Sequence, residues 1–200
     1  MIASATGPVL AVKDLTVVIH GEHGTFPVVS EMGLEISRGE TLCILGESGC
    51  GKSMTALALL GLLPDAGEIT GGKIEVDGID VLSLDRRQIE DMRGEEIAMI
   101  FQEPLTALNP VMKVGDQIAE GVRRHRKASG GAAWRRTLEV LRLVQMPDPE
   151  RRAHQYPHEL SGGMRQRAMI ALAIACEPKI IVADEPTSAL DVTIQAQILG

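Results

Sequence analysis

Aromatic side chains are scarce in this sequence, since Trp, Tyr and Phe together make up 2% of its 200 residues. The core must therefore be built mainly from aliphatic side chains. Trp134 and Tyr156 are better explained as packing residues than as platforms on which a ligand ring stacks.

The sequence also lacks the features of secreted, membrane-spanning and metal-binding proteins. Its three cysteines, Cys43, Cys50 and Cys176, do not have metal-ligand spacing, and an odd number without a secretory signal suggests reduced thiols. No run approaches the roughly 18 apolar residues that a membrane span needs. The N-terminus has no basic start followed by a long apolar block. These absences predict a cytoplasmic protein.

Positive charge is in the minority, with 20 Lys and Arg against 27 Asp and Glu, which gives a net charge of −7. This balance argues against a general nucleic-acid-binding protein. The basic run at residues 123–127 is interpreted as the solvated face of a helix.

The most informative stretch is GESGCGKS at residues 46–53, which matches the G-x-x-x-x-G-K-[ST] pattern in full. The apolar run 41–46 before it predicts a buried parallel strand, and residues 54–63 after it predict a helix that ends before Pro64. A glycine-rich loop between a strand and a helix is the arrangement that binds the phosphates of a nucleotide.

Within this loop, the glycines let backbone N–H groups close around the phosphates. Lys52 would reach the β- and γ-phosphates, and the hydroxyl of Ser53 would bind Mg²⁺. The predicted ATP-binding residues of this segment are Gly46, Glu47, Ser48, Gly49, Cys50, Gly51, Lys52, Ser53 and Met54.

Two further segments predict the metal and catalytic groups. In IIVADE, residues 180–185, an apolar strand ends at Asp184, which would hold Mg²⁺ through water, and Glu185 would polarise the attacking water. Gln102 is the last residue of the predicted strand 96–102, and its amide oxygen could bind the same Mg²⁺.

The stretch LSGGMRQR, residues 160–167, has two explanations. It could be a helix capped by Ser161 with a glycine turn. It could also be a second phosphate cradle, formed by Ser161 and the N–H groups of Gly162 and Gly163, that completes the ATP site of another molecule. Two subunits arranged head to tail would then enclose two ATP molecules.

The remaining periodicity suggests a helical insertion in an α/β core. Strands are predicted at residues 9–19, 33–36 and 73–78, whereas residues 114–127, 132–146 and 161–175 have helical periodicity. We therefore divide the chain into three parts. These are residues 1–102, a β lobe and the first part of the ATPase core; 103–160, a helical lobe; and 161–200, the rest of the core.

Taken together, these motifs resemble the nucleotide-binding subunits of ABC transporters. The matching residues are GESGCGKS, Gln102 as the Q-loop, LSGGM, IIVADE, and SALD at residues 188–191 as the D-loop. The stretches FQEPLTALNP and SALDVTIQAQIL narrow the resemblance to the ATPases of oligopeptide, dipeptide and nickel importers. The resemblance implies an α/β fold with a RecA-like P-loop NTPase core, an N-terminal antiparallel β lobe and an inserted helical lobe.

The resemblance also implies partners and a location. Such subunits form head-to-tail dimers, in which Asp191 would cross the interface, and they dock on the coupling helices of a membrane permease served by an external binding protein. The protein would lie on the cytoplasmic face of the membrane and hydrolyse ATP to power peptide import. The sequence leaves open the transported substrate and whether the dimer contains identical or different subunits.

This sequence departs from the family pattern in two respects. No aromatic residue follows the first strand to stack on adenine, where His20 is the nearest ring. The switch histidine of the family is expected beyond residue 200, so we expect a truncated chain with little ATP turnover.

Two other functions remain open at this stage. One is a soluble ABC ATPase that acts in DNA repair or on ribosomes, although no CxxC motif or heptad run supports it. The other is a module that dimerises on ATP without hydrolysing it, for which Glu185 would be unnecessary.

Overall fold

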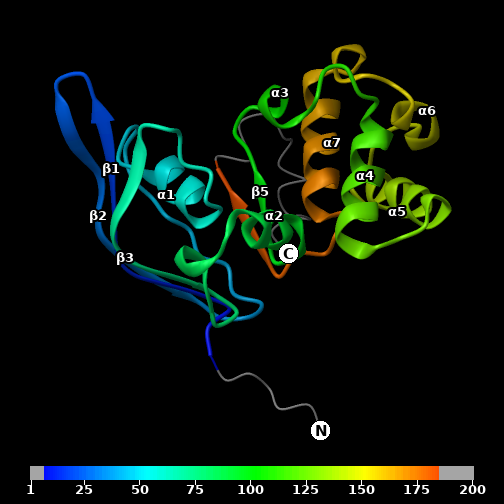
Figure 1. The fold of residues 1–200 in the computed structure, drawn as a ribbon. Helices are drawn as coiled ribbons and strands as arrows, with labels where there is room; N and C mark the ends of the chain where they lie inside the picture. Colours follow the sequence, from blue (N-terminus) through cyan, green and yellow to red (C-terminus); the bar gives the residue numbers. More distant parts are fainter. Residues whose placement is uncertain (1–6, 185–200) are drawn as a thin grey trace, which may run out of the picture. The chain divides into compact units, whose positions relative to one another are not determined.

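The computed structural model describes residues 7–184, so the predicted roles of Glu185 and Asp191 lie outside the described residues. The chain divides into two compact units, Met1–Ile97 and Ala98–Gly200 (Figure 1). The three-part division inferred from the sequence stays a prediction.

The first unit is built on an antiparallel sheet with the strand order β2-β1-β3-β4. Its core side chains are aliphatic, and Leu15, Val17 and Ile74 are fully buried. The elements in chain order are β1 (Leu10–Gly21), β2 (Gly24–Ile36), α1 (Lys52–Leu59), β3 (Gly67–Val76), β4 (Ile79–Asp80), the 3-10 helix η1 (Val81–Ser83) and α2 (Arg86–Glu95).

The strands predicted at residues 9–19, 33–36 and 73–78 correspond to β1, β2 and β3, but β2 and β3 begin earlier than predicted, at Gly24 and Gly67, and β3 ends at Val76. The turn between β1 and β2 contains only Glu22 and His23 because Gly21 pairs with Gly24. The positive φ of 128° at Gly24 lets the chain reverse within two residues.

The prediction of a buried strand at residues 41–46 is wrong. These residues have no strand conformation, and the side chain of Leu45 is 92% exposed. A buried strand needs hydrogen-bonded neighbours, and neither sheet in the described part of the chain includes this segment.

The second unit is mainly helical, and its helices enclose an aliphatic core with Val114, Ile118, Val140 and Leu141 fully buried. Figure 1 shows α7 lying beside α4 and α5. The elements are β5 (Ile97–Ile100), α3 (Pro104–Ala107), α4 (Val114–Arg126), α5 (Gly130–Leu143), α6 (Pro149–Ala153), the 3-10 helix η2 (Pro157–Glu159), α7 (Gly162–Ile174) and β6 (Ile180–Ala183).

The helices predicted at residues 114–127, 132–146 and 161–175 correspond to α4, α5 and α7. Trp134 packs against the edge of this core, with its ring 5.0 Å from that of His154, which confirms its interpretation as a packing residue.

Among residues 7–184, no helix combines the length and apolar character required to cross a bilayer.

Candidate functional site

The glycine-rich loop leads directly into α1, with Gly51 as the N-cap and Lys52 as the first helical residue. Gly49 and Gly51 have φ angles of 82° and 93°, a conformation that side chains with a Cβ adopt only with strain. A Cβ on Gly51 would also collide with the carbonyl oxygen of Val28. Two glycines of the predicted cradle are therefore required by the backbone itself.

The Lys52 side chain folds back across the loop. Its Nζ donates hydrogen bonds to the carbonyl oxygens of Gly46, at 2.7 Å, and Glu47, at 2.8 Å, and lies 3.5 Å from Sγ of Cys50. The ammonium group thus bridges the two ends of the loop. A bound phosphate would compete with these carbonyls for the same positive charge.

The predicted metal ligand Ser53 and the adjacent Met54 lie in the first turn of α1. Ser53 is exposed, so its hydroxyl is accessible to a ligand above the loop. The backbone N–H groups of this first turn have no helical acceptor of their own and carry the positive end of the helix dipole.

The far end of α1 is held by an arginine that the sequence did not single out. Arg93 donates through Nε to the carbonyl oxygen of Leu60, at 2.7 Å, and through Nη2 to that of Gly61, at 2.6 Å. Partial burial lowers the pKa of Arg93, but a guanidinium stays protonated at neutral pH. Its positive charge therefore lies at the negative end of the α1 dipole.

Arg93 reaches α1 from a break near the end of α2, where Gly94 has a φ of 88°. The helix begins with a capping box, because the Asp85 side chain accepts from Gln88 N–H and the Gln88 side chain accepts from Asp85 N–H. The D-x-x-Q spacing was the sequence signal that could have predicted α2.

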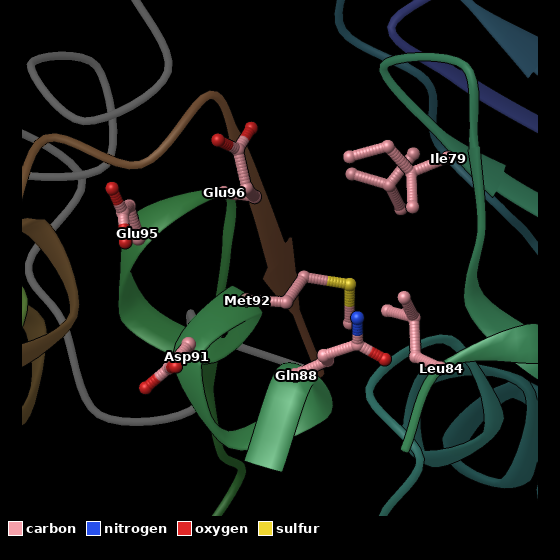
Figure 2. Close-up of a pocket in the computed structure, with 8 residues that line it drawn as sticks. Ile79, Leu84, Gln88, Asp91, Met92, Glu95 and Glu96 are labelled. Carbon is pink, nitrogen blue, oxygen red and sulfur yellow. The ribbon is translucent and has the colours of Figure 1, made fainter. Parts of the chain in front are cut away.

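A hollow of about 310 Å³ lies between α2 and the β3–β4 region, as Figure 2 shows. It combines apolar and acidic side chains and contains none of the residues predicted to bind ATP. Its lining residues are Val76, Ile79, Leu84, Gln88, Asp91, Met92, Glu95 and Glu96.

In the second unit, two predicted magnesium ligands follow paired strands. Asp184 comes directly after β6, and its N–H donates to the carbonyl oxygen of Ile100, the last residue of β5, at 3.0 Å. Gln102 lies two residues after Ile100. The pairing of β5 with β6 therefore brings these two side chains to the same region of the unit.

Ser161 caps α7, as its hydroxyl accepts from Met164 N–H at 3.4 Å. The serine-capped helix is thus confirmed, and the role of this segment as a phosphate cradle stays a prediction. A Cβ on Gly162 or Gly163 would meet no atom within 4 Å, so the backbone here is open to an approaching group.

A second hollow, of about 410 Å³, borders the start of α7. It is lined by Gln145, Pro147, Ser161, Gly163, Met164 and Arg167. The turn after α5 therefore forms one wall of a space whose other wall contains the predicted phosphate cradle.

His20, the ring nearest to the position of an adenine-stacking side chain, is already engaged. Its Nδ1 lies 3.1 Å from Thr25 Oγ1, and its Nε2 lies 2.8 Å from Glu68 Oε2. These contacts hold the ring on the three adjoining strands β1, β2 and β3.

The predicted site residues are divided between the two units. Lys52 and Ser53 belong to the first unit, whereas Gln102, Ser161 and Asp184 belong to the second. Their roles in binding ATP and Mg²⁺ stay predictions.

A mixed α/β fold and a glycine-rich loop that opens a helix with a lysine define the class of P-loop nucleotide-binding proteins. The model of the family described as ABC transporter matches residues 29–188, and the chain belongs to this family.

Two curated relatives of this chain are named as ATP-binding proteins of peptide or dipeptide transport. The chain is 53% identical to the probable peptide ABC transporter ATP-binding protein y4tR of Sinorhizobium fredii, over 95% of this chain and 57% of that protein. It is 50% identical to the dipeptide transport ATP-binding protein DppD of Bacillus subtilis, over 96% of this chain and 57% of that protein. The chain therefore spans a little over half the length of these relatives.

Solved structures support the fold. The ATP-binding cassette MJ0796, described as a dimeric post-hydrolysis state bound to ADP and Pi, matches with a TM-score of 0.84 and 29% identity. The match covers 94% of this chain and 79% of the MJ0796 chain. The expected α/β P-loop fold of the ABC type is confirmed.

Proposed function

We propose that the chain is the ATP-binding and ATP-hydrolysing part of a subunit that powers the import of oligopeptides or dipeptides. The observation that carries the proposal is the loop at residues 46–53, in which Lys52 closes a glycine-rich cradle at the start of α1. The peptide specificity is supported by the names of relatives that are 53% and 50% identical.

ATP would bind with its phosphates over this loop, where Lys52 and the first N–H groups of α1 meet negative charge. The predicted ligands of Mg²⁺ are the hydroxyl of Ser53, the amide oxygen of Gln102 and the carboxylate of Asp184. These are all oxygen donors, which Mg²⁺ prefers. When bound, Mg²⁺ would neutralise charge on the phosphates. Glu185 would then orient and polarise the attacking water.

Ser161, Gly162 and Gly163 would act on the nucleotide of a second subunit rather than on their own. The open backbone at both glycines supports this arrangement. In the head-to-tail dimer, Asp191 would cross the interface, and ATP would favour the closed state through contacts that the open state lacks. The dimer would dock on permease subunits at the cytoplasmic face of the membrane, and a binding protein outside the cell would deliver the peptide.

Calorimetric titration with Mg-ATP, together with a phosphate-release assay, tests this function. We expect binding that Lys52→Ala weakens by about tenfold or more, because charged hydrogen bonds to the phosphates are lost. Lys73→Ala is the matched control, since Lys73 pairs with Glu75 on the sheet and lies outside the loop. Equal affinity of the Lys52 and Lys73 variants would contradict the assigned site.

Hydrolysis is tested separately in the full-length gene product. We expect phosphate release that Glu185→Gln abolishes while ATP binding remains. ATP-induced dimers that persist in the unmodified protein without phosphate release would instead favour a module that only dimerises.

A further inference from the structure

Two arginines connect α5 and α7 in a reciprocal arrangement. Arg167, on α7, donates through Nη1 to the carbonyl oxygens of Val144, at 2.8 Å, and Gln145, at 3.0 Å, at the C-terminal end of α5. Arg136, on α5, donates to the carbonyl oxygens of Ala175, at 3.0 Å, and Ile174, at 3.4 Å, at the C-terminal end of α7. Each guanidinium therefore lies at the negative end of the other helix.

The two contacts fix opposite ends of α7. Arg136 holds the last residues of the helix, whereas Arg167 lies in its first half, near the cap at Ser161. The rise of an α-helix separates Ser161 from Ala175 by roughly 20 Å. Loss of either arginine would weaken the packing of α5 on α7, but only loss of Arg167 would act directly on the start of α7.

The turn that Arg167 holds is part of the wall facing the phosphate cradle. Gln145 and Pro147 line the same hollow as Ser161, Gly163 and Met164. Gln145 and Asp148 have φ angles of 55° and 50°, so the turn adopts a conformation that most side chains disfavour. The two hydrogen bonds from Arg167 stabilise this turn where it meets the start of α7.

We propose that Arg167 is a positioning residue for the cradle formed by Ser161, Gly162 and Gly163, and that it sets this cradle for the nucleotide of a second subunit. The proposal rests on the proposed function. The N–H groups of a helix start bind phosphate only within hydrogen-bonding distance and angle, so a small displacement of α7 against the turn costs affinity. Arg167 itself need not contact the nucleotide, because Nη1 already donates to two carbonyls.

The test uses the full-length gene product with Glu185→Gln, alone and mixed with a second ATPase subunit of the same transporter. Arg167→Met removes the donors but keeps an apolar stem, and Arg136→Met is the matched control at the other end of α7. ATP-dependent dimerisation is measured by analytical ultracentrifugation, and monomer ATP affinity is measured below the concentration at which dimers form. Thermal unfolding of each variant reports the structural cost.

We expect Arg167→Met to weaken ATP-dependent dimerisation by tenfold or more while monomer ATP affinity stays within twofold. Arg136→Met should lower the unfolding temperature to a similar extent and leave dimerisation within twofold. Equal loss of dimerisation in the two variants, or no loss in Arg167→Met, would overturn the positioning role alone. If the Glu185→Gln parent does not dimerise on ATP, the head-to-tail site itself is wrong, and the role of Arg167 is overturned with it.

Discussion

Arg136 and Arg167 each cap the helix that carries the other: Arg167 binds the carbonyls of Val144 and Gln145, and Arg136 binds those of Ile174 and Ala175. Carbonyl groups at a helix end have no partner within the helix. The reciprocal arrangement satisfies several of them with charged donors, and it joins the helix that carries the LSGGM motif to the rest of the second unit.

We expect Arg136→Ala and Arg167→Ala each to reduce the free energy of unfolding by about 1–3 kcal/mol, because half-buried carbonyls lose charged donors. The exposed Arg123 on α4 is the control, and its alanine variant should change stability by less than about 0.5 kcal/mol. Urea unfolding followed by circular dichroism measures all three. A loss for Arg123 as large as for the other two would contradict the capping role.

Arg93→Ala should destabilise the protein by about 1–3 kcal/mol, because the carbonyls of Leu60 and Gly61 would lose their donors at the end of α1. Arg86→Ala is the matched control on the same helix, since its ion pair with Glu90 is exposed and such pairs contribute about 0–1 kcal/mol. Denaturant titrations measure the free energy of unfolding of both variants. Equal values for the two variants would show that the Arg93 contact does not stabilise α1.

Gly51→Ala should destabilise the loop more than Gly49→Ala. Both glycines have positive φ angles, which cost an alanine roughly 1–2 kcal/mol. At Gly51 the added Cβ also meets the Val28 carbonyl oxygen, whereas at Gly49 it meets no atom within 4 Å. Thermal unfolding of the two variants ranks them, and a Gly49 variant as unstable as the Gly51 variant would contradict the steric argument.

We expect protonation of the Glu177 carboxyl to lower the free energy of unfolding in acid. Its hydrogen bond to Arg126 holds the pKa of this carboxyl below its ordinary value of 4.5, with a further contribution from Arg136. A depressed pKa in the folded state stabilises the protein above the ordinary value, and this contribution is lost as pH falls through the folded pKa. The stabilisation from the ion pair between Glu177 and Arg126 is small because both side chains are largely exposed.

Unfolding temperatures of the unmodified protein and of Glu177→Gln between pH 2 and pH 7 measure this effect. The unmodified protein should be the more stable of the two near neutral pH, and the difference should shrink towards the acid end. A difference that is constant across the range would show that the charge of Glu177 does not contribute.

The local elements could be predicted where one segment contains its own signal. The loop at residues 46–53, the alternation in β1 and the helical periodicity of α4, α5 and α7 were all visible in the sequence. The capping box at Asp85 was visible too, but the helix that follows it is mostly polar, with only Ile89 and Met92 as large apolar side chains, so α2 was missed.

Long-range contacts could not be predicted in the same way. The apolar run at residues 41–46 predicted a buried strand, but burial depends on neighbours that the run does not specify, and Leu45 is exposed. The hydrogen bond from Arg93 to the Leu60 carbonyl connects residues 33 positions apart in the sequence. The hydrogen bond from Arg167 to the Val144 carbonyl connects residues 23 positions apart.

The sequence by itself determined the family and the types of groups expected to bind ATP and Mg²⁺, because these depend on short motifs whose glycine, lysine and carboxylate chemistry is local. Only the tertiary structure decided which carbonyls the arginines hold, which apolar runs are buried and where the two hollows lie. Those features depend on contacts between side chains from distant segments of the chain, and local propensity does not specify these contacts.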